Sequence, residues 1–167
     1  MFREMRRKNQ ALPPELCRKA LDRNTHGVLA LAGDGGYPYA VPLSYLFEDG
    51  KLYFHCAKEG HKIDAVRSCT KASFCVVDAD DVLPDEFTTN FRSVIAFGQV
   101  RLLDNPEEIR AVMFRLAQRC SPGRDEGIRR TIREEFAGLA ILEFSVEHMT
   151  GKESRRLMQA RKAGRRD

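Results

Sequence analysis

The sequence predicts a mainly β protein, a small barrel of about six antiparallel strands with helices around it. In the first third of the chain, short apolar stretches alternate with tight-turn signals at residues 33–36 and 48–50, a pattern typical of β-hairpins. Pro42 and Gly98 then interrupt two of the expected strands. Such breaks favour a sheet that bends and closes over a flat, open one.

Turn chemistry and apolar periodicity place the elements in order. The strands are expected at residues 28–32, 39–47, 51–56, 72–78, 91–103 and 138–146. The helices are expected at residues 12–24, 61–68, 106–120 and 124–136, where apolar side chains recur three or four positions apart. The third helix has the clearest start, because Asn105 suits the cap and Pro106 the first helical position. Residues 80–90 have weak periodicity and are expected to form a loop.

The strand at residues 91–103 is apolar on both faces. Val94, Ala96 and Val100 alternate with Ile95 and Phe97, so neither face suits water. Such a strand lies at the centre of a sheet or is covered by another subunit. The glycine within it, at position 98, predicts a bend of the kind that closes barrels.

Length and composition indicate one globular domain over residues 1–167, because 43% of the residues are hydrophobic. No stretch of about 18 apolar residues is present, so no membrane partner is expected. The basic start, residues 1–8, has no apolar stretch behind it and does not read as a secretory signal, so a cytoplasmic location is expected.

The charge is unevenly distributed. The formal net charge is +4, with +3 on residues 1–8 and +5 on residues 152–167, which leaves −4 on the rest. The body is therefore mildly acidic and lacks the basic, aromatic-rich face of a nucleic-acid-binding protein. We expect no nucleic-acid partner, and we expect the basic ends, at residues 1–10 and 155–167, to be solvated and frayed.

The five cysteines are odd in number and have no zinc-knuckle spacing. Without a secretory signal they are expected to be reduced thiols that mostly fill the core. The ligand types of His55, Cys56 and His61 would suit zinc, but their spacing gives no support, and no metal is expected.

The stretch from Phe54 to Lys62 is the strongest site signal. An apolar strand ends near His55, Gly60 supplies a turn, and a helix begins directly after it. A helix start exposes backbone N–H groups and partial positive charge, and Lys62 adds a full positive charge. The stretch therefore suits the phosphate of a cofactor whose ring system lies against His55. An ordinary strand-turn-helix with a solvated lysine remains the alternative.

The position of Pro42 within an expected strand has two possible explanations. A proline cannot donate a hydrogen bond to a strand ladder. Its place in the middle of the 39–47 strand therefore means either a broken ladder, whose free backbone groups could bind a ligand, or a simple edge strand.

Several motifs occur in a specific order along the chain. They are Gly36-Tyr37-Pro38 with Val41-Pro42-Leu43-Ser44-Tyr45, Phe54-His55-Cys56-Ala57 with Gly60-His61-Lys62, Phe91-Arg92-Ser93-Val94 with Phe97-Gly98, and Met149-Thr150-Gly151-Lys152. Together they resemble the pyridoxamine 5′-phosphate oxidase-like FMN-binding split-barrel superfamily over about residues 10–155. Within it the chain looks most like the nitroimidazole-resistance (Nim) branch.

This resemblance implies a six-stranded split β-barrel that forms a homodimer, with FMN bound at the dimer interface. By position, the strand whose backbone would line the flavin ring contains Val41, Pro42, Leu43, Ser44 and Tyr45. The residues that would lie beside the flavin and its ribityl chain are His55, Cys56 and Ala57. The basic pair that would hold the phosphate is His61 and Lys62, after the Gly60 turn, and Ser93 would reach the flavin from the second subunit.

One position departs from the family pattern. The first residue of the basic pair is often arginine in the oxidases, whereas here it is His61. Because histidine titrates near neutrality, the phosphate site would be weaker or sensitive to pH. The residues that bind the substrate phosphate in true pyridoxamine phosphate oxidases are not evident, so that activity is not expected.

The expected function is that of an FMN-dependent oxidoreductase. A nicotinamide nucleotide or another cellular reductant would reduce the flavin, and a nitroaromatic or quinone would accept the electrons, oriented or protonated by His55. One alternative is a non-enzymatic flavin- or haem-binding protein, since the chain has histidines at positions 26, 55, 61 and 148. Another is a barrel that uses a deazaflavin.

Overall fold

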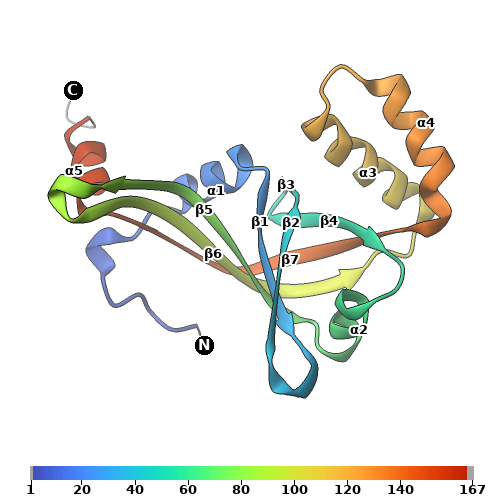
Figure 1. Ribbon diagram of the computed structural model, residues 1–167, viewed down its shortest axis with the longest axis horizontal. Coiled ribbons are helices and arrows are strands. Elements are labelled where there is room, and N and C mark those ends of the chain that lie inside the picture. Colours follow the sequence, from blue (N-terminus) through green and yellow to red (C-terminus); the bar gives the residue numbers. More distant parts are fainter. Residues whose placement is uncertain (1, 165–167) are drawn as a thin grey trace.

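One antiparallel sheet of seven strands forms the centre of the computed structural model, which describes residues 2–164 (Figure 1). Its strand order is β2-β1-β5-β6-β7-β4-β3. The strands are β1 (His26–Ala32), β2 (Pro38–Ser44), β3 (Leu46–Glu48), β4 (Lys51–Ala57), β5 (Lys71–Leu83), β6 (Thr88–Leu102) and β7 (Leu139–Glu153). The helices are α1 (Pro14–Arg23), α2 (His61–Ser68), α3 (Pro106–Cys120), α4 (Asp125–Glu135) and α5 (Arg155–Ala163). The predicted mainly β class is confirmed.

The sheet curls around an interior because its two edge strands follow each other directly in the sequence. The edge strands β2 and β3 are separated by Tyr45 alone, and successive Cα atoms are only about 3.8 Å apart. No strand pairing joins β2 to β3 within residues 2–164, so the curled sheet stays open along this seam. This arrangement fits a split barrel.

The predicted count of six strands is wrong, because the single strand expected at residues 39–47 divides at Tyr45 into β2 and β3. Tyr45 leaves the ladder: its backbone N–H donates to the Thr25 carbonyl oxygen, 3.1 Å away. Its side chain is fully buried, and the phenolic O–H donates to the Leu21 carbonyl oxygen of α1. Burial raises the pKa of this phenol well above its ordinary value.

Pro42 lies in an edge strand, and the ladder through it is unbroken. β1 and β2 pair continuously from His26 opposite Ser44 to Ala32 opposite Pro38, with Val28 opposite Pro42. The edge-strand reading is therefore correct, and the broken ladder is not observed. Free backbone groups lie along the outer edge of β2, where no strand pairs with it in the described part of the chain.

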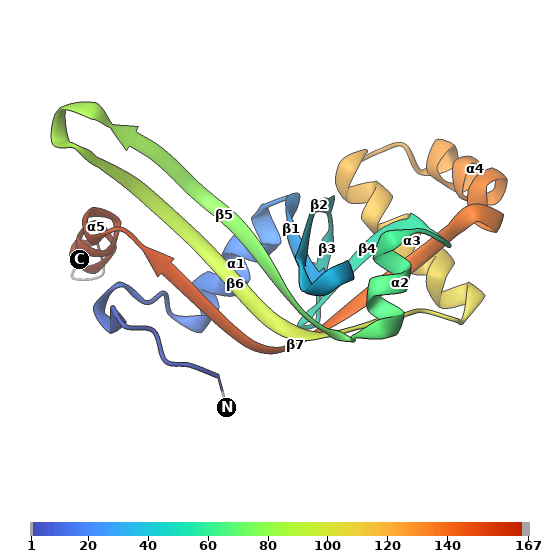
Figure 2. The same ribbon diagram turned by 60° about the horizontal axis from the view of Figure 1, so that its bottom comes forward.

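Three segments differ from expectation. The loop expected at residues 80–90 is the tip of a long β5–β6 hairpin, in which pairing continues as far as Leu83 opposite Thr88. The last strand runs on to Glu153. Residues 155–163 of the basic end form α5, whose first turn is capped by Ser154 Oγ. Residues 165–167 of that end lie outside the described part. The N-terminal segment, the hairpin tip and α5 lie at one end of the molecule (Figures 1 and 2).

Two apolar cores lie on opposite sides of β7, because successive side chains of a strand point to opposite faces. Leu142 points into the curled sheet, where it joins Leu29, Phe74 and side chains of α1 and α2. Ile141 points outward, into a second core that α3 and α4 cover. Each fully buried aliphatic side chain of this kind contributes about 1.5–3 kcal/mol to folding. The second core positions α3 and α4 over the ends of β4 and β7 (Figure 1).

The bend predicted at Gly98 is present. The register between β6 and β7 shifts after Phe97, which lies opposite His148, whereas Gly98 lies opposite Val146. A Cβ at position 98 would collide with the backbone carbonyl of Ser145, so only glycine fits this close approach. Within the described residues, no helix has both the length and the apolar character needed to cross a membrane.

Candidate functional site

A cavity of about 490 Å³ lies where β4 ends and α2 begins. Nine residues line it: Leu43, Ser44, His55, Cys56, Ala57, Lys62, Glu135, Gly138 and Leu139. The first six are among the residues that the sequence proposed for a cofactor site. They come from β2, β4 and α2, so the curling of the sheet is what brings them together.

β4 presents His55 and Cys56 to different surroundings. His55 lies directly opposite Ile141 of β7, so it points to the side that α3 and α4 cover. Its side chain is exposed at the cavity, and within residues 2–164 it makes no ion pair or side-chain hydrogen bond. Cys56 faces the interior. Burial raises the pKa of its thiol, and the nearby positive charge of Lys62 opposes that rise.

The start of α2 provides a phosphate-binding geometry. Gly60 has φ +106° and ψ 173°, a conformation open to glycine and strained for other residues. No side chain caps the helix. The Ile63 N–H donates to the Gly60 carbonyl oxygen, 2.8 Å away, whereas the backbone N–H groups of His61 and Lys62 make no hydrogen bond within residues 2–164. Lys62 stands in that first turn, lines the cavity, and forms no ion pair among the described residues. The local reading of the sequence as a cationic helix start is therefore supported.

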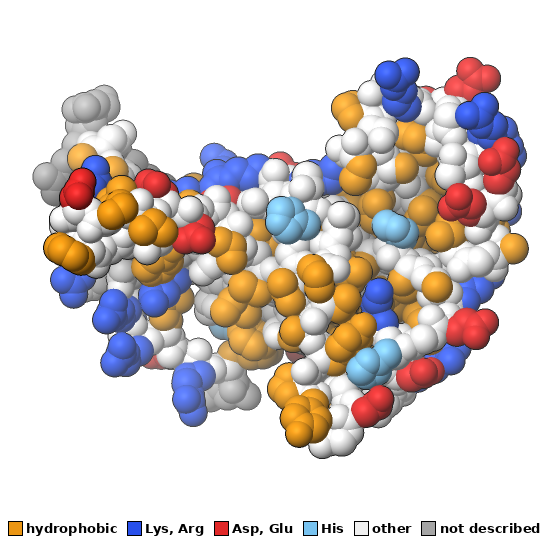
Figure 3. Space-filling model, in the orientation of Figure 1, with side chains coloured by type: hydrophobic (Ala, Val, Ile, Leu, Met, Phe, Trp, Pro, Cys, Tyr) orange, Lys and Arg blue, Asp and Glu red, His pale blue; other side chains and the backbone are white. Residues whose placement is uncertain are grey.

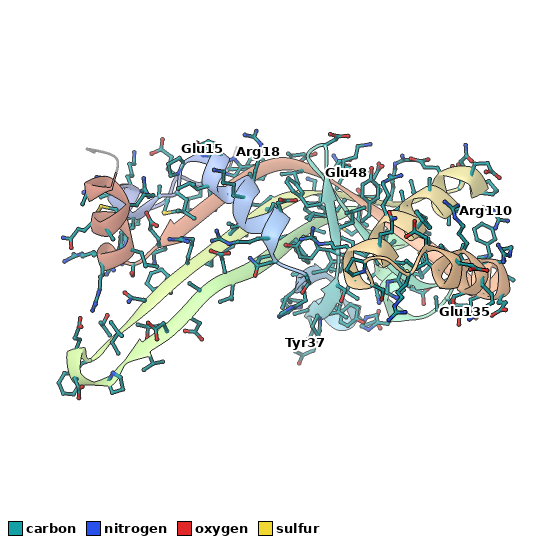
Figure 4. All side chains as sticks on the ribbon, turned by 90° about the horizontal axis from the view of Figure 1, so that it is seen from above. Glu15, Arg18, Tyr37, Glu48, Arg110 and Glu135 are labelled. Carbon is teal, nitrogen blue, oxygen red and sulfur yellow. The ribbon has the colours of Figure 1, made fainter. Side chains whose placement is uncertain are left out.

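His61, the other member of the expected basic pair, faces away from this cavity. Its ring stacks on Tyr39, with ring centroids 4.0 Å apart and planes at 17°. Its Nε2 lies 3.5 Å from Oδ2 of Asp34, at the tip of the β1–β2 hairpin. Tyr37, at the same tip, projects away from the molecule (Figure 4). His61 thus ties α2 to the hairpin, and it does not line the cavity.

Three further predicted residues contribute no side chain to the cavity. Val41 is half-buried and packs on the interior core, whereas Pro42 is exposed on the outer face of the sheet. Tyr45 is buried beneath α1. These residues can reach a ligand in the cavity only through the backbone, which is the role that the family resemblance gave to their strand.

Ser93 lies elsewhere in the molecule. It lines a separate cavity of about 270 Å³ together with Arg3, Met5, Ile95, Phe97, Thr150 and Lys152. This cavity is on the strands β6 and β7 and on the N-terminal segment. The expectation that Ser93 reaches the cofactor from a second subunit requires these two sites to face each other in a dimer.

The third wall of the cavity was not predicted from the sequence. Glu135 ends α4, and Gly138 and Leu139 lead into β7. Figure 4 shows Glu135 in the helical lobe formed by α3 and α4. Nothing in the local sequence distinguishes Glu135 from the other charged residues of that helix, so only tertiary packing identifies it.

A second charged region provides partners for two buried carboxylates. Asp78 and Glu153 have side chains no more than 1% exposed. Asp78 accepts hydrogen bonds from Arg23 and Asn24 and lies 3.4 Å from Arg92. Burial alone would raise the pKa of Asp78, but these hydrogen bonds and the arginine charges outweigh it, and the pKa lies below its ordinary value.

Glu153 continues this network toward α5. Its Oε1 accepts a hydrogen bond of 2.8 Å from Arg161, and its Oε2 lies 3.5 Å from Arg92. Both carboxylates are therefore bound by side chains of the protein, although Nε of Arg92 is buried without a hydrogen-bond partner within residues 2–164. No cluster of three or more histidine, cysteine or acidic side chains suited to a metal occurs within residues 2–164.

The fold and this site define a class, a curled-sheet protein with a cofactor-sized cavity at a cationic helix start. The family model for pyridoxamine 5′-phosphate oxidase matches residues 13–153. The match spans most of the chain, so the chain belongs to this family, and the resemblance noted in the sequence is confirmed. No curated protein matches the chain.

Three solved structures illustrate the fold. The flavocytochrome Anf3 of Azotobacter vinelandii superposes with a TM-score of 0.79 at 20% identity, over 90% of this chain and 72% of that one. An FAD- and haem-binding protein of Mycobacterium smegmatis gives 0.75 at 23% identity, over 87% and 74%. A protein of Bacteroides thetaiotaomicron described as a candidate 5-nitroimidazole antibiotic resistance protein gives 0.70 at 18% identity, over 86% of both chains. At these identities the likeness concerns the fold.

Proposed function

We propose that this protein binds FMN in the β4–α2 cavity and acts as a flavin-dependent oxidoreductase on a small acceptor of the quinone or nitroaromatic type. The observation that carries the proposal is the cavity itself, in which six predicted residues from three separate elements meet. Its volume of about 490 Å³ lies in the range of cofactor and ligand pockets. Family membership and the flavin-binding proteins that share the fold support the same cofactor class.

The residues fit a flavin mononucleotide. Lys62 and the free N–H groups at the start of α2 would hold the phosphate, because an ammonium group and a helix N-terminus both favour a dianion. Leu43, Cys56 and Ala57 offer a mainly apolar wall for a ring system. When bound, the flavin supplies the redox chemistry, and the protein supplies binding, orientation and electrostatics.

His55 has the position to act on the acceptor. It is exposed in the wall of the cavity and makes no side-chain hydrogen bond within the described residues, so both ring nitrogens are free to bind the acceptor. In the overall reaction a nicotinamide nucleotide loses a hydride, a quinone gains two electrons and two protons, and the second proton comes from solvent. His55 would orient the acceptor oxygen and deliver a proton to it.

The apolar outer face of the sheet supports a homodimer. Val28, Cys75 and Ile95 lie directly opposite one another on β1, β5 and β6, and Val28 and Ile95 are each 38% exposed. Val77, two residues after Cys75 on the same face of β5, is 63% exposed. Exposed patches of this kind mark interfaces. Sedimentation at twice the monomer mass is expected, whereas a stable monomer would remove Ser93 from the cofactor site.

The proposed cofactor site is tested by FMN titration of a Lys62→Ala variant. Loss of a charge-assisted contact to the phosphate should weaken binding about ten- to hundredfold. Lys58→Ala is the matched control, because Lys58 is an exposed lysine of the same β4–α2 connection that does not line the cavity. Equal FMN affinity in both variants would remove Lys62 from the site.

The proposed reaction is tested by a His55→Ala variant. Quinone reduction by the FMN-loaded variant should fall in kcat while its FMN affinity stays within a factor of a few of wild type, because the phosphate anchor is intact. Stopped-flow mixing of the reduced protein with menadione measures the affected half-reaction. Unchanged turnover would exclude His55 from the mechanism.

A second candidate is a haem-binding protein, which the flavocytochrome and the FAD- and haem-binding protein among the structural relatives favour. His55, exposed at the cavity, is an available axial ligand. An intense Soret band after reconstitution with haem, lost in His55→Ala, is the expected sign of this alternative. Reconstitution with FMN alone would give no such band.

A further inference from the structure

A second cavity, of about 370 Å³, opens beside the proposed flavin site, between the α3–α4 lobe and the end of β4. It shares His55, Glu135 and Leu139 with the β4–α2 cavity, so the two cavities adjoin at these residues. The remaining lining comes from the helices and their connection: Met113, Ala117, Ser121, Arg124, Gly127, Ile128, Thr131 and Ile132. Figure 3 shows hydrophobic side chains gathered along the inner side of this lobe.

The cavity is elongated along α4. Its α4 lining follows helical spacing on one face, from Arg124 just before the helix to Glu135 at its end. At 1.5 Å per residue this face is roughly 16 Å long. Across from it, Met113 and Ala117 of α3 complete an apolar middle section. A ligand that enters from the helix connection would therefore lie along α4 and point its far end at His55.

The two ends of the cavity differ in charge. Arg124 stands at the end remote from His55, and it is the one cation among the described residues that line this cavity. It forms no ion pair within residues 2–164. Glu135 stands at the other end, in the wall shared with Lys62 of the flavin site. An acidic group on a ligand is thus attracted to the Arg124 end and repelled from the Glu135 end.

Gly127 leaves the cavity open about one helical turn from Arg124. It lies in the first turn of α4, where glycine costs helix stability relative to alanine. A Cβ built at this position would meet no atom within 4 Å. A larger side chain here would extend into empty space, so it can obstruct the cavity without displacing the protein around it.

We propose that this cavity binds the acceptor substrate, and that the acceptor is a flat, largely apolar ring compound bearing an acidic group. Its acid is held by Arg124, its ring lies between α3 and α4 beside Gly127, and its reducible end meets His55 at the junction with the flavin site. The acceptor role rests on the proposed function, whereas binding of the ring and acid depends on this cavity alone.

The test uses a non-reducible probe pair, 2-naphthoate and its neutral analogue 2-naphthamide, titrated by calorimetry into FMN-loaded and flavin-free protein. Wild type should bind the acid more tightly than the amide. Arg124→Leu should weaken naphthoate binding about tenfold and leave naphthamide binding unchanged. Arg130→Leu is the matched control, because Arg130 is an exposed arginine of α4 outside the cavity.

Gly127→Phe tests the location. It should abolish binding of both probes and reduction of 1,4-naphthoquinone-6-carboxylate, which carries its acid on the ring remote from the quinone, while FMN affinity stays at the wild-type value because Gly127 does not line the flavin cavity. Gly127→Ala should retain all three properties. Naphthoate binding that is unchanged in both Arg124→Leu and Gly127→Phe would overturn the proposal.

Failure of the proposed function gives a different result. Wild-type protein that takes up no FMN, yet binds naphthoate through Arg124, would overturn the acceptor role together with the oxidoreductase assignment. FMN binding with unaltered naphthoate affinity in the variants would overturn only the cavity assignment.

Discussion

The charged groups around Asp78 and the charged group of Lys62 differ in burial and in the partners that they contact. Asp78 is buried and contacts Arg23, Asn24 and Arg92. Lys62 lines an open cavity and forms no ion pair within the described residues. A buried charge needs partners because desolvation is costly, whereas a charge held at a cavity without a partner is available to a ligand. The first region should therefore control stability, and the second should control binding.

The largest effect is expected for Asp78→Asn. The substitution keeps the size of the side chain but leaves Arg92, a mostly buried arginine, without one of its two carboxylate partners. The free energy of unfolding should fall by about 3 kcal/mol, the lower end of the range for broken buried pairs, since Arg23 is half-exposed and regains water. Urea denaturation followed by circular dichroism measures it.

Lys62→Ala provides the contrasting result in the same assay. Because Lys62 has no partner to lose, its free energy of unfolding should stay within about 0.5 kcal/mol of wild type. A loss comparable to that of Asp78→Asn would contradict the division between a structural and a ligand-binding region.

The carboxylate of Asp78 should also make the free energy of unfolding depend on pH, and this effect is smaller. The pKa of Asp78 is lower in the folded protein than in the unfolded chain, where the pKa of aspartate is about 3.9. The stabilisation from its charge is therefore complete above that pH and is lost as the pH falls through the folded-state pKa.

The measurement compares wild type with Asp78→Asn between pH 7 and pH 2. The difference in their free energy of unfolding should be constant down to about pH 4 and should shrink below it. If the difference grows in acid, the folded-state pKa of Asp78 is raised. That result would contradict the conclusion that the hydrogen bonds from Arg23 and Asn24 lower this pKa.

Local chemistry made much of the fold predictable. The Asp49-Gly50 turn joins β3 and β4, and Asn105 caps α3 by accepting hydrogen bonds from the backbone N–H groups of Glu107 and Glu108. Gly98 marks the bend between β6 and β7. In each case one residue type satisfies a backbone requirement that few others can meet, so the sequence alone reveals it.

Tertiary packing determined what local chemistry could not. The sequence predicts Tyr45 to be a strand residue. In the structure its O–H donates a hydrogen bond to the Leu21 carbonyl oxygen, and the strand divides at this residue. Residues 80–90 gave no strand signal, but pairing along the β5–β6 hairpin continues as far as Leu83 opposite Thr88. The cavity wall at Glu135 depends on how α4 packs against β7 and β4, which no local pattern encodes.

The most direct test of the account is the visible absorption spectrum of the protein purified without added cofactor, repeated after addition of FMN. Wild type and Lys58→Ala should both show the twin bands of a bound, oxidised flavin. Lys62→Ala should release its flavin at a much lower concentration of competing phosphate. A colourless protein that takes up no FMN would contradict it, because the β4–α2 cavity would then hold some other ligand or none.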